Sequence, residues 1–129
     1  MTDKLTTKSQ EALASAIQLA THAGNPSLEP VHLLATLVAQ EVGVAVGLLN
    51  AVGADPRMIA SRTEAAIAAL PGASGSTVSQ PQTSRALLGV ITQAGEEAGA
   101  LGDEYVSTEH LLLALAADRS AAGDVLRAA

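Results

Sequence analysis

Two short acidic motifs that contain histidine have the greatest capacity for chemistry in this sequence. Glu29 and His32 are three residues apart, a spacing that places both on one helix face, as in carboxylate-bridged metal sites. Such a site needs a second Glu-x-x-His pair, whereas Glu109 and His110 are adjacent and so point to different faces. The structural interpretation places both histidines in a first helical turn, with ring nitrogens bonded to backbone or hydroxyl groups. On this basis we expect no metal site.

Other catalytic arrangements are missing from the sequence. There is no cysteine, which excludes disulfides, zinc–thiolate sites and cysteine nucleophiles. There is no G-x-S-x-G motif, and the glycines of 72–77 lack the Gly-Lys-Ser/Thr ending of a phosphate loop. The acidic pairs Glu96–Glu97 and Asp103–Glu104 are typical of solvated faces, and His22 stands alone. We therefore expect no catalytic site and no cofactor.

The composition favours a single all-α domain. The 129 residues are 48% hydrophobic, rich in alanine and leucine, and Tyr105 is their only aromatic residue. Alanine and leucine are strong helix formers, so the core should be aliphatic and helical. A net charge of −6 disfavours nucleic acids and anionic membranes as partners. With no long apolar run and no apolar segment in the first ten residues, we expect a cytoplasmic protein.

The chain contains an internal duplication. Segment 28–37, LEPVHLLATL, aligns with 106–115, VSTEHLLLAL, at a spacing of 78 residues, which pairs His32 with His110 and Gly24 with Gly102. One register held over so long a span predicts two pseudo-symmetric four-helix repeats. We place the first repeat at about 6–70, a flexible surface loop at 71–83 and the second repeat at about 84–129. The second repeat has no room for a fourth helix, so we expect that helix to be missing from this chain.

Start and stop signals predict seven helices. Thr7 and Gln10 have capping-box spacing, Gly24 is a helix-ending glycine, and Asp55 precedes a proline that favours a first helical turn. The expected helices begin near Thr6 or Thr7, Pro30, Val44, Asp55, Ser84, Ser107 and Ala121.

Periodicity predicts the core. The second and sixth helices are apolar nearly all round, so they should be the most buried elements. The first helix should bury Leu13, Ala16, Ile17 and Ala20, and the fifth should bury Leu87, Ile91, Ala94, Ala98 and Leu101. The complete set of expected core positions adds Leu34, Leu37, Leu48, Ile67, Leu112 and Leu115. Two packed repeats should leave an acidic groove lined by alanine and leucine, suited to apolar or basic peptides.

The duplicated pattern resembles a known family. A T-x-x-x-x-x-A-L start, a helix-ending glycine and then H-L-L-x-x-L is similar to the Clp N-terminal domain over essentially the whole chain. The LEPVHLL segment and the SQPQTSRAL end of the inter-repeat loop resemble the ClpB disaggregase branch more than the ClpC branch.

The resemblance implies a mostly monomeric, eight-helix domain without enzymatic activity of its own. Such domains are tethered to an AAA+ ATPase ring, engage unfolded or aggregated polypeptides for threading, and act with the DnaK chaperone system through the parent protein. The alternative is an adaptor-docking domain, as in the ClpC branch or in standalone Clp-N proteins.

The resemblance also implies a binding site. The polar residues that matter in ClpB relatives match Thr6, Asp103 and Glu109, and a neighbouring apolar patch falls on Ile91, Gln93 and His110, where only Ile91 keeps the apolar character. We therefore expect polypeptide binding at Thr6, Ile91, Asp103 and Glu109. The alternative is structural: Thr6 and Glu109 could cap helices, and Asp103 could order its loop.

Overall fold

The protein is described by a computed structural model, which covers residues 5–40, 44–51, 53–70, 82–103, 105–118 and 121–128. The chain is predominantly helical, as the sequence predicted, with one small pair of strands in the described part. The elements are α1 (Thr7–Ala23), β1 (Ser27–Leu28), α2 (Pro30–Ala39), α3 (Val44–Ala51), α4 (Pro56–Ala68), β2 (Gln82–Thr83), α5 (Arg85–Ala100), α6 (Thr108–Ala117) and α7 (Ala121–Ala128).

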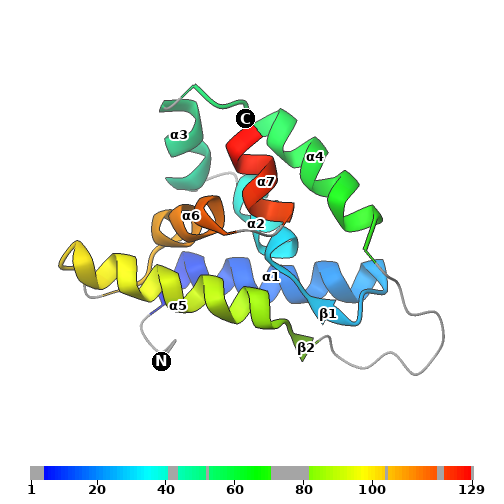
Figure 1. Cartoon of the computed structure of the whole chain (residues 1–129), viewed down its shortest axis with the longest axis horizontal. Helices are drawn as coiled ribbons and strands as arrows, with labels where there is room; N and C mark the ends of the chain where they lie inside the picture. The colour runs from blue at the N-terminus through cyan, green and yellow to red at the C-terminus, as the bar shows by residue number, and fades with distance from the viewer. Residues whose placement is uncertain are drawn as a thin grey trace.

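Helix α2 lies at the centre of the fold. It packs against each of the other six helices, and Figure 1 shows it between α1 and α4. Seven of its ten residues are buried, including Leu33, Leu34 and Leu37, and α6 is similarly enclosed. The prediction that these two helices are the most buried elements is therefore confirmed. Within the described part of the chain, no helix combines the length and apolar character needed to cross a membrane.

The helix boundaries follow the signals in the sequence. The Thr6 hydroxyl caps α1 by accepting from the Ser9 N–H at 3.2 Å, and the Ser84 hydroxyl caps α5 by accepting from the Leu87 N–H at 3.0 Å. Asp55 caps α4 in the same way. The predicted Thr7–Gln10 capping box is wrong, because Thr6 and not Thr7 is the N-cap residue of α1. The Gln10 side chain donates to the Leu5 carbonyl instead.

Glycines end the two long helices at matching positions. Gly24 and Gly102 adopt positive φ angles of 73° and 76°, a conformation that glycine reaches without steric cost. The next residue in each case bonds back to the helix: Asn25 N–H to the Ala20 carbonyl and Asp103 N–H to the Ala98 carbonyl. These matched turns, 78 residues apart, support the proposed duplication.

The strands join the two repeats to each other. Strand β2 pairs in parallel with β1, with Leu28 opposite Thr83, and an isolated parallel bridge joins Leu5 to Val106. In the 78-residue register Leu5 corresponds to Thr83 and Leu28 to Val106, so the two pairings are exchanged copies of each other. The expected loop at 71–83 is therefore wrong for 82 and 83, which form strand β2. Positions 71–81 lie outside the described residues.

The core is more alanine-rich than the sequence pattern suggested. Burial is confirmed for Leu34, Leu37, Ile67, Leu112 and Leu115. Four other expected core residues, Leu13, Ile17, Leu48 and Ile91, are only half-buried against that core. The α1 stripe is centred instead on Ala12, Ala16 and Ala20, and the α5 stripe on Leu87, Val90, Ala94 and Ala98, because small side chains let the helices approach while larger ones pack at the flanks. Leu101, expected to be buried, is 63% exposed.

Candidate functional site at the start of helix α6

Each central helix begins with a histidine that closes its first turn. His32 Nδ1 accepts a hydrogen bond from the Glu29 N–H at 2.9 Å, and His110 Nδ1 accepts one from the Ser107 N–H at 2.9 Å. A nitrogen that accepts carries no proton, so both rings hold their proton on Nε2. The structural interpretation of the histidines is confirmed for these contacts. The described residues contain no group of three or more histidine, aspartate or glutamate side chains arranged to hold a metal ion.

The Nε2 atoms contact different partners in the two repeats. His32 Nε2–H donates to the Asn25 carbonyl oxygen at 3.0 Å, and His110 Nε2–H donates to the Asp103 carboxylate at 2.9 Å. Burial lowers the pKa of His32, against the opposing effect of the Glu29 carboxylate and the bond to the Glu29 backbone. Asn25 is 3% exposed, whereas the Asp103 side chain is 49% exposed. The second repeat therefore presents a carboxylate to solvent where the first buries an amide.

Three of the four predicted site residues meet at the start of α6. The Thr6 N–H donates to the Val106 carbonyl at 3.0 Å, and the Ser9 hydroxyl donates to the same carbonyl at 2.9 Å. One residue further on, the Ser107 hydroxyl donates to Glu109 Oε1 at 3.0 Å. With the Asp103–His110 bond, these contacts gather Thr6, Asp103 and Glu109 around one helix end.

The structural roles of these residues differ. Thr6 is a helix cap, and Asp103 orders its turn through His110, as the structural interpretation expected. Glu109 is not a cap: it is exposed in the first turn of α6, where a carboxylate is stabilised by the positive end of the helix. The side chain of Glu109 is exposed and accepts a local hydrogen bond from the Ser107 hydroxyl, within the same helix start.

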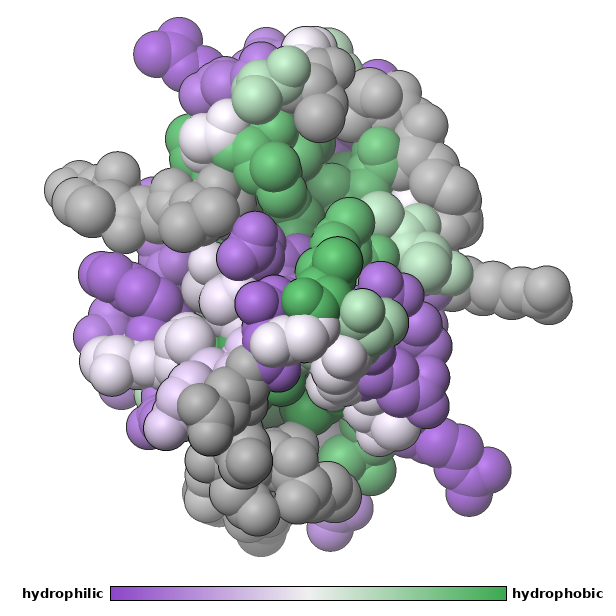
Figure 2. Space-filling model, turned by 90° about the vertical axis from the view of Figure 1, so that its left-hand side faces the viewer, coloured by the Kyte–Doolittle hydropathy of each residue, from purple (hydrophilic) through white to green (hydrophobic). Residues whose placement is uncertain are grey.

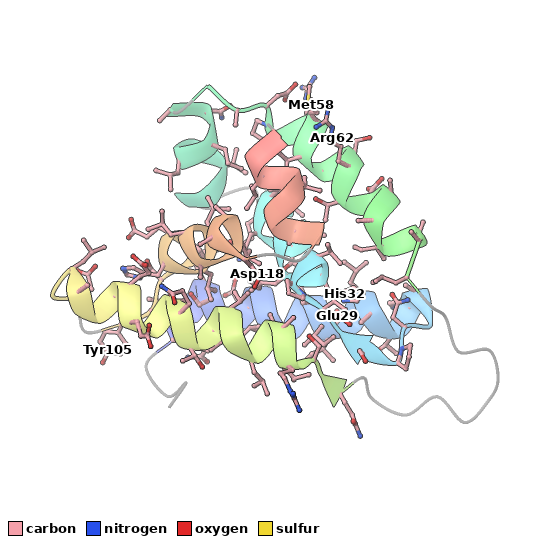
Figure 3. All side chains as sticks on the ribbon, viewed as in Figure 1. Glu29, His32, Met58, Arg62, Tyr105 and Asp118 are labelled. Atoms are coloured by element: carbon pink, nitrogen blue, oxygen red, sulfur yellow. The ribbon has the colours of Figure 1, made fainter. Side chains whose placement is uncertain are left out.

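Apolar side chains are exposed on either side of Asp103 along the chain. Ile91 is half-buried on α5, which packs against α6. Leu101 is 63% exposed and Tyr105 is 54% exposed, one on each side of Asp103 in the sequence. Figure 3 shows Tyr105 beyond the ribbon near the C-terminal end of α5. Figure 2, which faces that side of the molecule, shows hydrophobic residues at the surface among hydrophilic ones.

The remaining positions of the expected apolar patch do not contribute apolar surface. His110 is 1% exposed, so it supports Asp103 from within. Gln93 donates to the Glu97 carboxylate on its own helix. Sequence reasoning missed the Asn25–His32 and Asp103–His110 pairs. The sequence does contain a signal for these pairs, because Asn25 and Asp103 each stand seven positions before the histidine of their own repeat.

A hollow between the repeats is apolar and not acidic. It has a volume of about 250 Å³ and lies among α3, α6 and α7. Its lining residues are Leu48, Leu49, Gly53, Ala54, Leu112, Leu113, Ala116 and Leu126. The expectation of an alanine- and leucine-lined groove fits this hollow, whereas the carboxylates lie elsewhere, at the start of α6.

Comparisons with known proteins agree with this architecture. Residues 4–129 match the family described as the Clp repeat (R) N-terminal domain. The chain is 48% identical over 121 residues to the chaperone protein ClpB of Corynebacterium diphtheriae, covering 94% of this chain and 14% of that protein.

Solved structures share the fold at low sequence identity. The Hsp104 N-terminal domain from Candida albicans matches with a TM-score of 0.84 and 20% identity, over 98% of this chain and 81% of that one. The ClpV N-domain in complex with a VipB peptide matches with a TM-score of 0.72 and 20% identity, over 88% and 68%. The family match spans nearly the whole chain, and the relative described above, 48% identical, is a chaperone protein ClpB. The chain therefore belongs to the Clp repeat N-terminal domain family.

Proposed function

We propose that this chain is the substrate-engaging N-terminal domain of a ClpB-like AAA+ disaggregase, in which the two repeats act as one domain. It binds unfolded or aggregated polypeptide and delivers it to an attached ATPase ring for threading. The domain itself needs no catalytic site and no cofactor, acts in the cytoplasm as a monomer, and meets the DnaK system through its parent protein.

The observation that supports this proposal is the gathering of Thr6, Asp103 and Glu109 at the start of α6, beside exposed Leu101 and Tyr105. Unfolded polypeptides differ from folded ones in exposing apolar side chains and unpaired backbone N–H groups. The exposed apolar side chains of the site can bury the apolar side chains of an unfolded polypeptide. The two carboxylates can accept hydrogen bonds from its unpaired backbone N–H groups or from its lysine and arginine side chains. We assign Ile91, which is half-buried on α5, to the apolar side of the same site.

Two relationships add support from outside the chain. The chain spans only 14% of the ClpB protein that it matches, in keeping with a domain attached to a larger machine. The ClpV N-domain, which shares the fold, has been solved with a bound peptide, so domains of this architecture can present a peptide-binding surface.

The test separates binding from stability at one residue. Glu109→Ala removes an exposed carboxylate with a single local hydrogen bond, so the melting temperature should change little. Binding to a reduced and carboxymethylated model protein, followed by fluorescence anisotropy, should weaken by about threefold or more, as expected for a lost charge-assisted contact. Glu96→Ala, at an exposed position on α5, is the matched control and should leave binding unchanged.

Asp103→Ala and Thr6→Ala complete the set. Both residues also have structural roles, so binding is compared with the melting temperature of each variant. If binding decreases only in proportion to stability in all three variants, the residues are structural and the site assignment is wrong.

A further inference from the structure

A second groove lies in the first repeat, away from the start of α6. Helices α1 and α4 each pack on α2, and Figure 1 shows them on opposite sides of it. Between them is a hollow of about 450 Å³. This volume lies within the range of ligand-binding clefts in proteins.

The groove has an apolar floor and polar walls. The floor is formed by Leu19, Ala35 and Ile67, with Ala39 at its edge, together with the buried Thr36, whose hydroxyl donates to the Ala12 and Leu33 carbonyls. The walls carry the polar groups, which are Ser15, Gln18 and His22 from α1 and Glu64 from α4. Alanines at positions 35 and 39, one helical turn apart on α2, leave room for a partner backbone to approach closely. An apolar floor with polar rims is the arrangement into which amphipathic helices dock.

The second repeat does not reproduce this surface. In the 78-residue register, Leu19 corresponds to Glu97 and Ala35 corresponds to Leu113, whose side chain is 46% exposed. A glutamate would put a charge on the apolar floor, and a leucine would fill it. The chemistry of the groove is therefore a property of the first repeat and not a by-product of the fold.

The groove also has a defined charge. Glu64 is exposed on the α4 wall, and it takes part in neither of the ion pairs found among the described residues. On the α1 side, Glu11 lies one turn before Ser15 on the same helix face, although it pairs with Lys8 at 3.6 Å. A ligand with a cation beside its apolar face would complement this wall.

We propose that the groove between α1 and α4 docks a short amphipathic helix of a partner protein. Two aliphatic side chains of that helix, one turn apart, lie on Ala35 and Ala39, and a lysine or arginine on its flank pairs with Glu64. This site is separate from the polypeptide-binding site at the start of α6, which contains Asp103 and Glu109.

The experiment uses the 129-residue chain and a fluorescein-labelled, alanine-rich helical peptide with two leucines four residues apart and a lysine on the same side. Anisotropy should report saturable binding to the natural sequence. Ala35→Leu, which gives the floor the side chain of the second repeat, should weaken binding by about tenfold. Its matched control, Leu113→Ala, makes the reciprocal change on α6 and should leave peptide binding intact.

A charge exchange tests the groove without disturbing its floor. Glu64→Lys should weaken binding of the lysine peptide by about threefold or more and strengthen binding of a peptide with glutamate in place of lysine. Because Glu64 is exposed, this variant tests the proposal even if Ala35→Leu lowers stability.

Three results would overturn the proposal. The first is absence of saturable binding to the natural sequence at millimolar peptide. The second is binding that is indifferent to both Ala35→Leu and Glu64→Lys. The third is binding lost in Glu109→Ala but kept in both groove variants, which would place the peptide at the start of α6 instead.

Discussion

The starts of α2 and α6 show how one backbone arrangement supports two different surfaces. In both, a histidine accepts a bond from the residue before the helix and donates to a polar residue in the preceding turn. Asn25 and Val31 of the first repeat are buried, whereas their counterparts Asp103 and Glu109 are exposed.

This difference indicates which positions the fold itself requires. In both copies the histidine Nδ1 accepts from the backbone N–H of the residue before the helix, and Nε2–H donates to a polar side chain of the preceding turn, so the ring itself is buried with both nitrogens paired. The positions around it are free to vary with their surroundings: a valine where the helix faces the core, a glutamate where it faces water. The Glu109 carboxylate is therefore not needed to form the helix start, whereas Asp103 also orders the preceding turn through His110.

The largest expected effect comes from exchanging the two surfaces. Val31→Glu would place a carboxylate at a position that is 2% exposed, and should cost about 3–5 kcal/mol of unfolding free energy, as for other unpaired buried charges. The reciprocal change, Glu109→Val, exposes a valine and should cost less than about 1 kcal/mol. Urea unfolding followed by circular dichroism measures both. Equal losses would show that the two helix starts do not differ in burial.

The next test asks whether the two central helices contribute equally to the core. Leu34 and Leu112 are equivalent in register and are 0% and 5% exposed. Leu34→Ala and Leu112→Ala should each cost about 2–5 kcal/mol, with the greater loss at Leu34, because α2 is enclosed by six helices and Leu112 borders the apolar hollow. Thermal or urea unfolding checks the order, and an unchanged midpoint in either variant would contradict the burial described here.

The smallest expected effect is a dependence on pH. The folded pKa of His32 is below the ordinary value, so in acid the unfolded chain binds more protons than the folded one. The stability contributed by His32 should be complete above about pH 6.5 and decrease as the pH falls towards the folded pKa. A proton on Nδ1 would also remove the acceptor for the Glu29 N–H.

The measurement is an NMR titration of the His32 ring together with urea unfolding at about pH 7 and about pH 5. The variant His22→Ala, at the exposed end of α1, is the control and should keep the acid-dependent loss. A His32 ring that titrates at or above the ordinary value would contradict the prediction.

The sequence predicted the helices well because their boundaries depend on local chemistry. Glycines at positions 24 and 102, prolines at 30 and 56, and hydroxyls at 6, 84 and 107 act within one turn of the backbone. The order of the helices followed from the same signals. The central placement of α2 and α6 followed from the apolar residues on nearly all sides of these two helices.

Features that depend on tertiary contacts were harder to predict from the sequence. The periodicity of apolar residues predicted that the buried face of α1 includes Leu13 and Ile17. In the structure that face is centred on Ala12 and Ala16, and Leu13 and Ile17 are only half-buried. Residues 82 and 83 read as part of a polar loop, because their strand exists only through Leu28 and its neighbour. The meeting of Thr6 with the start of α6 likewise depends on a backbone bond to Val106.

The exchanged strands bear on how the chain reaches its fold. The bond from the Ser9 hydroxyl to the Val106 carbonyl closes a sequence separation of 97 residues. Contacts of such high separation carry a large loop-closure entropy and form after local helices. Because each repeat completes its partner's strand, half of the chain would leave these strands unpaired, and two copies of a single repeat could satisfy them by exchanging segments. Two single-repeat chains that exchanged these segments would form a domain-swapped dimer. Joining the two chains of such a dimer end to end would give the exchanged strand pairings of this protein.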